Sequence, residues 1–407
     1  MFVIFCRIFQ FFFNFAAFAL PWRKASVVEG PGSIRKIPEL LLEHNVKKPI
    51  LVTDNGLVKA GIAQKIVDVL VSAKFPYVMY ADVEPNPSVN TVNKIQKLYL
   101  EQGCDGIIAL GGGSSIDAAK GAAARAVRPK KSVSQLGGFL KVLRKLPLFI
   151  AVPTTAGTGS ETTIAALITD TGTRHKYAIM DFSLIPRYAV LDANLTAGLP
   201  PSITAATGMD ALTHAVEAYL CWTYNTKESI QFALDAVKTI FANLEKVYAN
   251  GKDIQARQEM LLASYKAGFA FTRAGVGNIH AVAHTLGGLY NTPHGLANAI
   301  ILPVVLDDYG ADVHNKLAVL AYAAGLVTEK DVKTNAEKAR IFIDAVYAMN
   351  ERMGIPKGFD CIKDEDIPQI ITWASGECNP LYPVPVIFSR QRFLKIIKRI
   401  KLVGSPD

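Results

Sequence analysis

Hydrophobic and polar residues follow two different patterns, which divide the chain at about residue 195. Before this point, short apolar runs predict strands at 48–54, 77–80, 106–110 and 148–152, and amphipathic stretches predict helices at 62–74 and 89–102. Buried strands that alternate with helices are typical of a parallel sheet. Beyond residue 195, apolar residues recur at helical spacing over 203–220, 227–249, 254–272 and 337–353. The chain of 407 residues is therefore predicted to form an α/β domain followed by an all-helical domain.

The first 20 residues form a separate, phenylalanine-rich segment. Arg7, Gln10 and Asn14 interrupt its apolar run. A signal peptide has an unbroken apolar stretch, and a membrane span has about 20 apolar residues with few interruptions, so neither interpretation fits. Two interpretations remain open: an amphipathic segment that contacts a membrane peripherally, and an extension that packs on the protein body. Packing is the favoured expectation.

The net charge of +9 first suggests a nucleic-acid partner, but the excess is diffuse and no nucleic-acid-binding signature accompanies it. In the basic C-terminal tail, Phe393, Ile396, Ile397 and Ile400 fall at helical spacing, so the cations between them are expected on the solvated face of a packed helix. No nucleic-acid partner is therefore expected. Five cysteines without a CxxC motif indicate a reducing compartment, and the protein is expected to be cytoplasmic.

Four residues in the helical half have the chemistry and spacing of metal ligands: Asp210, His214, His280 and His294. Asp210 and His214 are four residues apart in a predicted helix, so both side chains lie on one face and can meet one ion. His280 and His284 repeat this spacing. Three imidazoles and one carboxylate suit divalent iron, zinc or nickel rather than calcium or magnesium. The alternative, that these are ordinary helix histidines, accounts less well for the whole set.

A glycine-rich loop at 110–120 follows a predicted strand and opens a helix. Glycines allow a pyrophosphate to approach the backbone, and a helix N-terminus supplies free N–H groups. The loop has neither the P-loop pattern nor the spaced G-x-G-x-x-G pattern, so a purely structural turn stays an alternative. A second polar loop, 153–161, follows the next strand. Asp54 also ends a strand, where it could bond ribose hydroxyls or simply cap a helix.

Together these motifs resemble the iron-containing (group III) alcohol dehydrogenase family. The resemblance runs from about residue 26 to about 385 and includes Gly-Gly-Gly-Ser-Ser-Ile-Asp at 111–117, Pro-Thr-Thr-Ala-Gly-Thr-Gly-Ser-Glu at 153–161, Gly-Met-Asp-Ala-Leu-Thr-His-Ala-Val-Glu at 208–217 and Tyr-Asn-Thr-Pro-His-Gly at 290–295. It implies the dehydroquinate synthase-like fold. The implied domains are an apolar extension at 1–25, an α/β dinucleotide-binding domain at 26–195 and an all-helical metal-binding domain at 196–407, with the active site in the cleft between the last two.

The resemblance also implies an activity and its cofactors: reversible hydride transfer between a primary alcohol or aldehyde and NAD(H), with divalent iron held by the four ligands above. Zinc could replace the iron. NAD is expected rather than NADP, because family members that prefer NADP commonly have glycine in place of Asp54. The implied cofactor contacts are Asp54, Asn86, Gly112, Gly113, Ser114, Asp117, Thr154, Thr158, Thr163 and Lys176. His284 is implied to lie near the nicotinamide and to relay the proton, with a packing role as the alternative. A homodimer is the family expectation.

Three other kinds of function are compatible with parts of this sequence. A polyol dehydrogenase or a hydroxyacid–oxoacid transhydrogenase could use the same scaffold, and the sequence shows no pocket feature that separates them. A metal-dependent hydrolase would not need the loop at 111–115. A non-enzymatic role at a membrane would depend on the apolar N-terminus alone.

Overall fold

The computed structural model describes the chain except for residues 19, 171–174 and 403–407. It divides into two compact units. The α/β unit comprises Pro21–Gly198 and Lys252–Tyr265, and the helical unit comprises Met1–Leu20, Leu199–Gly251 and Lys266–Asp407.

The α/β unit is built on a six-stranded sheet in the order β1-β9-β6-β4-β2-β3, in which every neighbouring pair is parallel. Its strands are β1 (Ser26–Glu29), β2 (Pro49–Val52), β3 (Val78–Tyr80), β4 (Gly106–Gly111), β6 (Leu148–Pro153) and β9 (Tyr188–Leu191). The four strands expected from the sequence are β2, β3, β4 and β6. The parallel α/β fold is confirmed.

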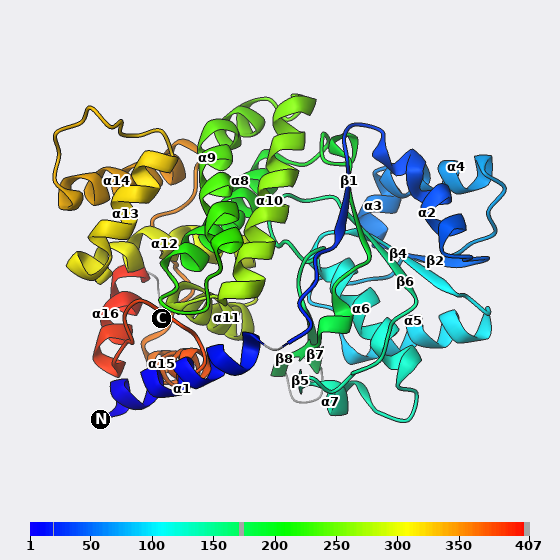
Figure 1. Cartoon of the computed structure of the whole chain (residues 1–407), viewed down its shortest axis with the longest axis horizontal. Helices are drawn as coiled ribbons and strands as arrows, with labels where there is room; N and C mark the ends of the chain where they lie inside the picture. The colour runs from blue at the N-terminus through cyan, green and yellow to red at the C-terminus, as the bar shows by residue number, and fades with distance from the viewer. Residues whose placement is uncertain (19, 171–174, 403–407) are drawn as a thin grey trace. The chain divides into compact units, whose positions relative to one another are not determined.

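Both faces of the sheet are covered by helices, because successive side chains of a strand point to opposite faces (Figure 1). Ile107 belongs to the core on one face and Ile108 to the core on the other. The first core includes residues of α5 (Val89–Glu101) and α6 (Gly113–Val127), and the second includes residues of α2 (Ile37–Glu43) and α4 (Ile62–Ser72). Strands buried on both faces read as continuous apolar runs, which is why the sequence revealed them.

A second sheet in this unit was not expected. Strands β7 (Ala165–Asp170) and β8 (His175–Met180) pair antiparallel, and the short β5 (Gly138–Phe139) pairs with β8. The short helices α3 (Asn55–Lys59) and α7 (Val133–Leu136), with residues 254–265 of α10, complete the α-helices of the unit among the described residues.

The helical unit contains the helices expected at 203–220, 227–249 and 337–353 and several more, whereas the helix expected at 254–272 is shared between the two units. Among the described residues, its helices are α1 (Phe2–Phe18), α8 (Pro201–Leu220), α9 (Lys227–Ala249), residues 266–274 of α10 (Ile254–Ala274), α11 (Asn278–Tyr290), α12 (His294–Tyr309), α13 (His314–Ala323), α14 (Asn335–Arg352), α15 (Ile367–Cys378) and α16 (Arg390–Ile400). Local signals fix several of the ends: Pro201 stands in the first turn of α8, and Thr226 and Thr334 form capping boxes at α9 and α14.

The N-terminal segment is a helix, α1, with one face packed on the helical unit. Arg7 donates to the carbonyl oxygens of Val384 (2.8 Å) and Pro385 (2.7 Å), and Gln10 donates to that of Tyr382 (2.7 Å). The packed arrangement is therefore confirmed for this face. Among the described residues, no helix has the combined length and apolar character that crossing a membrane requires.

Candidate metal and nucleotide sites

The four predicted metal ligands lie together in the helical unit. Helix α8 carries Asp210 and His214 one turn apart, α11 carries His280, and α12 begins at His294. One potential ligand atom from each residue lies within 4.8 Å of those of the others. The His214 ring stacks on that of His280, with 4.5 Å between the ring centroids. Ligands from three helices, separated by up to 84 residues in the chain, therefore form one cluster.

A glycine allows α12 to approach α8 closely enough to complete this cluster. A Cβ atom on Gly295 would lie 2.4 Å from the carbonyl oxygen of Ala206 and 3.3 Å from Cβ of Asp210. The first of these distances is far below van der Waals contact, so any side chain here would force the helices apart. Gly295 thus sets the position of its neighbour His294 relative to Asp210.

Side-chain atoms of three predicted ligands converge on one side-chain nitrogen. Nδ2 of Asn298 donates to Oδ1 of Asp210 at 2.7 Å and lies 3.0 Å and 3.2 Å from Nε2 of His280 and His294. Three potential ligand atoms therefore point toward one place. This is also the arrangement that a cation requires, so the donor set fits a divalent metal.

Glu217 fixes the orientation of the His280 ring. Its Oε2 lies 2.6 Å from Nδ1 of His280 and accepts the N–H of Gly277 at 2.8 Å, and its Oε1 accepts the N–H of Ile279 at 2.8 Å. With the ring proton on Nδ1, Nε2 presents a lone pair to the cluster. A carboxylate on the outer nitrogen of a ligating histidine is a common arrangement that fixes the tautomer.

Burial keeps His280 uncharged. Desolvation, together with the neighbouring histidines His214, His294 and His284, holds the pKa of His280 well below its usual value, so the ring is neutral and able to act as a ligand at neutral pH. Burial raises the pKa of Glu217 to about 8, against the effect of the backbone N–H groups that donate to it, and a cation bound at the cluster would favour its ionised form. Both groups are thus held in a water-poor region where one positive charge would be strongly stabilised.

His284 lies beside the cluster but outside the four-residue set. Its ring stacks on that of His294, with 5.1 Å between centroids, and its Nδ1 lies 2.6 Å from Oε1 of Glu377. The hydroxyl of Tyr382 donates to the same oxygen at 2.8 Å. About a quarter of the His284 side chain is exposed, which gives it contact with solvent. The predicted relay residue thus has a carboxylate that can orient its ring.

The glycine-rich loop lies where the strand order of the parallel sheet reverses. β3 extends the sheet on one side of β2, whereas β4 lies on its other side, and ligands of open α/β sheets bind at such a point. Asp54 follows β2, and Gly111 ends β4. Oγ of Ser115, in the first turn of α6, donates to Oδ2 of Asp54 at 3.5 Å. Oδ1 of Asp54 accepts the N–H of Leu57 at 3.0 Å and so caps α3. The carboxylate of Asp54 therefore caps α3 and also reaches the first turn of α6.

Other predicted cofactor contacts surround the N-terminus of α6. The N–H of Asn86 donates to Oγ of Ser114 at 3.3 Å, and the N–H of Thr154 donates to the carbonyl of Gly111 at 3.0 Å. A Cβ atom on Gly113 would lie 3.1 Å from the side chain of Thr158. Gly112 is the N-cap residue, with no side chain of its own over the helix end. The free N–H groups of α6 are thus framed by polar loops.

Two predicted contacts have structural partners instead, and one is not described. Asp117 accepts hydrogen bonds from Oγ of Ser160 and the N–H of Leu167, both at 3.0 Å. Thr163 accepts from Nζ of the fully buried Lys120 at 2.8 Å through its carbonyl and again through its hydroxyl. These residues fasten the 153–161 loop to α6. The backbone of Lys176 lies in β8, but its side chain is outside the described part of the chain.

Sequence reasoning missed three residues of the metal region: Glu217, Asn298 and Glu377. Glu217 follows Asp210 by seven residues and Asn298 follows His294 by four, so helical spacing already placed each on the face of a ligand. Glu377 is 93 residues from His284 and stands near the end of α15, where no pattern pointed to it.

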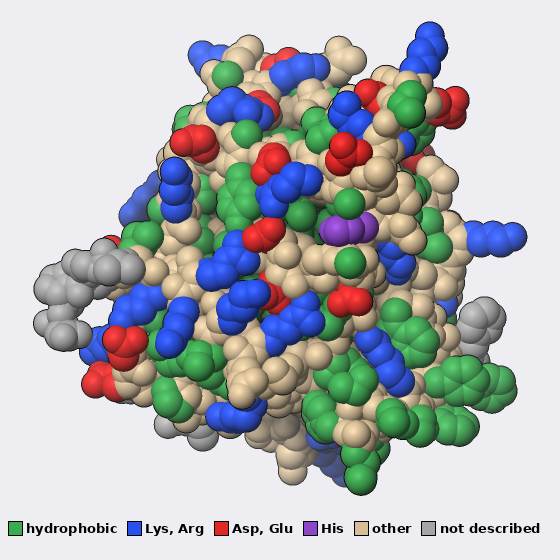
Figure 2. Space-filling view, turned by 90° about the vertical axis from the view of Figure 1, so that its left-hand side faces the viewer, with side chains coloured by type: hydrophobic (Ala, Val, Ile, Leu, Met, Phe, Trp, Pro, Cys, Tyr) green, Lys and Arg blue, Asp and Glu red, His purple; other side chains and the backbone are tan. Residues whose placement is uncertain are grey.

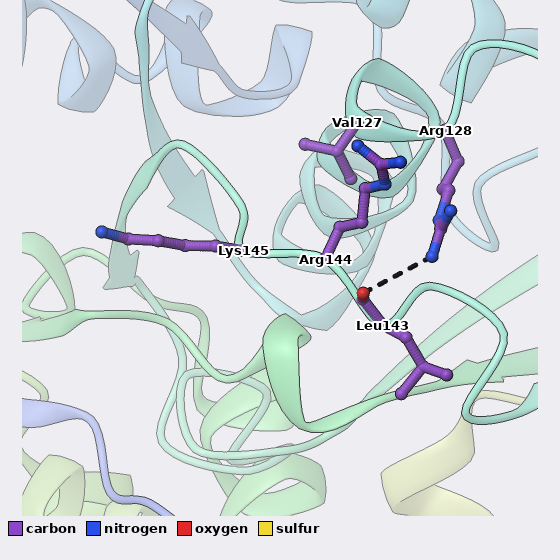
Figure 3. Close-up of a pocket in the computed structure, with 5 residues that line it drawn as sticks. All are labelled: Val127, Arg128, Leu143, Arg144 and Lys145. Atoms are coloured by element: carbon purple, nitrogen blue, oxygen red, sulfur yellow. Dashed lines mark hydrogen bonds between the residues drawn. The ribbon is translucent and has the colours of Figure 1, made fainter.

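The pocket shown in Figure 3 belongs to neither site. It measures about 680 Å³ and is lined by Val127, Arg128, Leu143, Arg144 and Lys145. It lies at the C-terminal end of α6, about 20 Å along the helix from Gly112 at 1.5 Å per residue. Arg128 donates to the carbonyl of Leu143, while the side chains of Arg144 and Lys145 point in other directions. The three cations therefore do not converge on a common ligand position.

The parallel sheet and the four-donor cluster define the class of the protein, a metal- and nucleotide-dependent oxidoreductase. The family Iron-containing alcohol dehydrogenase matches residues 24–193, and the Fe-containing alcohol dehydrogenase family, C-terminal, matches residues 204–401. The chain belongs to the iron-containing alcohol dehydrogenase family.

Relatives and a solved structure agree with this assignment. The chain is 37% identical over 355 residues to a 1,3-propanediol dehydrogenase of Klebsiella pneumoniae, covering 86% of this chain and 90% of the relative. It is 34% identical over 347 residues to an NAD-dependent methanol dehydrogenase of Bacillus methanolicus, covering 84% and 89%. An alcohol dehydrogenase from Oenococcus oeni superposes with a TM-score of 0.88 at 34% identity, covering 94% and 100%. The predicted family, and with it an alcohol dehydrogenase dependent on NAD and iron, is confirmed.

Proposed function

We propose that Asp210, His214, His280 and His294 hold the catalytic divalent iron. The proposal is supported by one observation above all, the approach of four ligand atoms from three helices to within 4.8 Å of one another. When bound, such an ion acts as a Lewis acid that polarises the oxygen of an alcohol or aldehyde. Zinc competes for the same donors, because affinity order favours it over ferrous iron.

His284 is the residue to which we assign proton transfer. With Nδ1–H donating to Glu377, Nε2 is the ring nitrogen that would accept the proton that the alcohol loses, and the partial exposure of the ring gives a route to solvent. Glu377 stabilises the positive ring that results, and Tyr382 holds Glu377 in place. A histidine with only a packing role would need neither the carboxylate of Glu377 nor the hydroxyl of Tyr382 that holds it.

The nucleotide is assigned to the carboxyl edge of the parallel sheet. The N–H groups at Gly112, Gly113 and Ser114 would bind the pyrophosphate, in the positive field at the start of α6. Asp54 binds the ribose hydroxyls and repels a 2′-phosphate, which selects NAD over NADP. The remaining assigned contacts are Asn86, Asp117, Thr154, Thr158, Thr163 and Lys176, of which Asp117 and Thr163 act by holding the loop at 153–161 in shape.

The proposed substrates are short primary alcohols and diols, in both directions of the reaction. The named relatives act on methanol and 1,3-propanediol, and the second of these favours a polyol dehydrogenase as the specific alternative. A hydroxyacid–oxoacid transhydrogenase is the remaining alternative on this scaffold. It is distinguished by turnover that needs a second organic substrate in place of free NAD.

The proposed organisation follows the same reasoning. Residues 26–195 form the dinucleotide-binding domain and 196–407 the metal-binding domain, with 1–25 as an extension. We assign the protein to the cytoplasm, in keeping with its five free cysteines. A homodimer without a nucleic-acid partner is the proposed assembly.

One reconstitution experiment tests the central proposal. The protein is purified anaerobically, stripped and reloaded with ferrous iron or zinc, and NADH formation is followed with short primary alcohols and diols. Metal-dependent turnover with NAD and little with NADP is the expected result. His214→Ala should lose metal and activity together, whereas His284→Ala should keep its metal and lose activity. Full activity of metal-free His214→Ala would refute the ligand assignment.

A further inference from the structure

The outward face of α1 is apolar along its length. From residue 2 to residue 15, the residues with exposed side chains are all hydrophobic: Phe2, Val3, Ile4, Phe5, Ile8, Phe9, Phe11, Phe12 and Phe15, which are 37% to 79% exposed. The inward face carries Cys6 and Gln10, both fully buried. One helix therefore divides into a face that packs on the protein and a face that presents six phenylalanines to the surroundings.

This face is larger than chance exposure explains. At roughly 200 Å² for each phenylalanine side chain, the exposed fractions of the six rings correspond to on the order of 700 Å² of apolar surface. The largest apolar patch on a typical monomer is about 300–600 Å² and is often functional. A contiguous surface of this size indicates a binding face.

The helix is held firmly enough to present that face. Gln10 is central: its amide donates to the carbonyls of Pro380 and Tyr382, and its Oε1 accepts from the indole N–H of Trp222 at 2.6 Å. The guanidinium of Arg7 lies 4.9 Å from the centroid of the Trp222 ring. Trp222 is 41% exposed beside the helix. An indole with a bonded N–H and an exposed ring suits a boundary between polar and apolar surroundings.

A basic helix accompanies the apolar one. Helix α16 carries Arg390, Arg392, Lys395, Lys398 and Arg399 and no acidic residue, and the segment that leads into it is the one that binds Arg7. Asp307 and Asp308 pair with three of these cations. Arg390 and Lys398 are exposed and stand outside those ion pairs. Figure 2, which looks onto the side where Figure 1 draws α1 and α16, shows hydrophobic side chains at one edge and Lys and Arg side chains beside them.

We propose that the outward face of α1 docks on the surface of an anionic lipid bilayer, with α16 supplying the electrostatic attraction. An apolar helix face that lies in the interface and a basic patch next to it are the two signals that peripheral binding combines. A second protein copy is the less fitting occupant, because protein interfaces carry about one hydrogen bond per 100–200 Å² and the outward side chains of α1 offer none. Packing on the body and membrane contact are thus properties of opposite faces of one helix.

The test is vesicle co-sedimentation of the full-length protein. The vesicles are phosphatidylcholine alone and phosphatidylcholine with about a third phosphatidylglycerol. The variants are Phe5→Ser/Phe12→Ser on the outward face and Arg390→Glu/Lys398→Glu on α16. The matched control is Leu143→Ser/Val332→Ser, which changes two other exposed hydrophobic residues, 63% and 103% exposed. Light scattering of each protein without lipid records its oligomeric state.

We expect the wild type and the control to bind anionic vesicles, and the phenylalanine variant to bind at least about tenfold more weakly. The charge variant should lose its preference for anionic over neutral vesicles, and all variants should keep alcohol dehydrogenase activity on soluble substrates. Equal vesicle binding by wild type and the phenylalanine variant would overturn the proposal. So would a wild-type oligomer that binds no vesicles and dissociates in the phenylalanine variant, since that would identify a second copy as the occupant.

Discussion

Replacing Glu217 by glutamine should weaken metal binding without removing a ligand. The carboxylate accepts three N–H groups, from Gly277, Ile279 and the His280 ring. Glutamine keeps one oxygen and places an NH₂ group where the other stood, so at least one of the three donors meets another donor. Where that donor is Nδ1 of His280, the ring is pushed to the other tautomer, and Nε2 then carries a proton instead of a lone pair.

The size of the effect follows from the bonds that are lost. A hydrogen bond to a charged group contributes about 1.5–3 kcal/mol, and removing a carboxylate behind a ligating histidine lowers metal affinity by about 10- to 100-fold. The two figures agree, because each factor of ten is about 1.4 kcal/mol. We therefore expect the dissociation constant for zinc or cobalt to rise by about one to two orders of magnitude.

The assay is competition with a chromophoric chelator under anaerobic conditions, with the melting temperature of the metal-free proteins as a check on folding. Glu377→Gln is the matched control, because Glu377 bonds the ring of His284, which is outside the ligand set. Its metal affinity should stay within about twofold of wild type. A folded Glu217→Gln protein with wild-type affinity would refute the reasoning, and equal weakening in both variants would indicate that His284 takes part in binding.

Three further changes test the packing around these sites. Gly295→Ala should destabilise the protein by about 1–3 kcal/mol in urea unfolding and weaken metal binding in chelator competition. Gly288→Ala is the control: a Cβ atom at Gly288 has no atom within 4 Å, so neither effect is expected. Asp308→Asn should lower stability at neutral pH by about 3 kcal/mol, because it breaks the ion pairs of a buried carboxylate. Burial alone would raise the pKa of Asp308, but Arg392 and Lys395 lower it below its ordinary value. The stabilisation is therefore present above the ordinary carboxyl pKa and is lost as the pH falls through the lowered pKa of Asp308, which urea unfolding at several pH values would measure. Burial lowers the pKa of Lys120 to about 8. Between pH 8 and 10.5 the unfolded chain therefore binds more protons than the folded protein, and the stability of the wild type should rise with pH. Lys120→Met should reduce this rise in urea unfolding followed against pH, and an identical rise in both proteins would contradict the argument.

Much of the fold and of the metal cluster was predictable because the relevant signals are local. Asp210 and His214 share a helix, and the buried strands of the parallel sheet read as apolar runs, so periodicity alone placed them. Contacts between distant segments gave no such signal. The pairing of His284 with Glu377 depends on how α11 and α15 pack, which no spacing in the chain records.

The nucleotide region shows a second limit of sequence reasoning. Asp117 and Thr163 carry polar groups in the expected motifs, yet their hydrogen bonds go to Ser160, Leu167 and Lys120 within the protein. A motif records that a residue is required but not whether it contacts the cofactor or shapes the loop that does. The two faces of α1 could not be predicted for a similar reason, since an apolar run does not show which of its residues the rest of the protein will cover.

The start of α11 is capped from another helix. Its own N-cap residue, Gly277, has no side chain, and the backbone N–H groups of Gly277 and Ile279 are satisfied by Glu217 of α8. The first turn of α11 therefore cannot open without exposing a buried carboxylate of α8, and the two helices should exchange their amide hydrogens as one cooperative block. Each of these helices carries ligands of the same cluster, so a local opening would release them together. The metal cluster thus coincides with a unit of local stability, and slow amide exchange at Ile279 would report directly on its integrity.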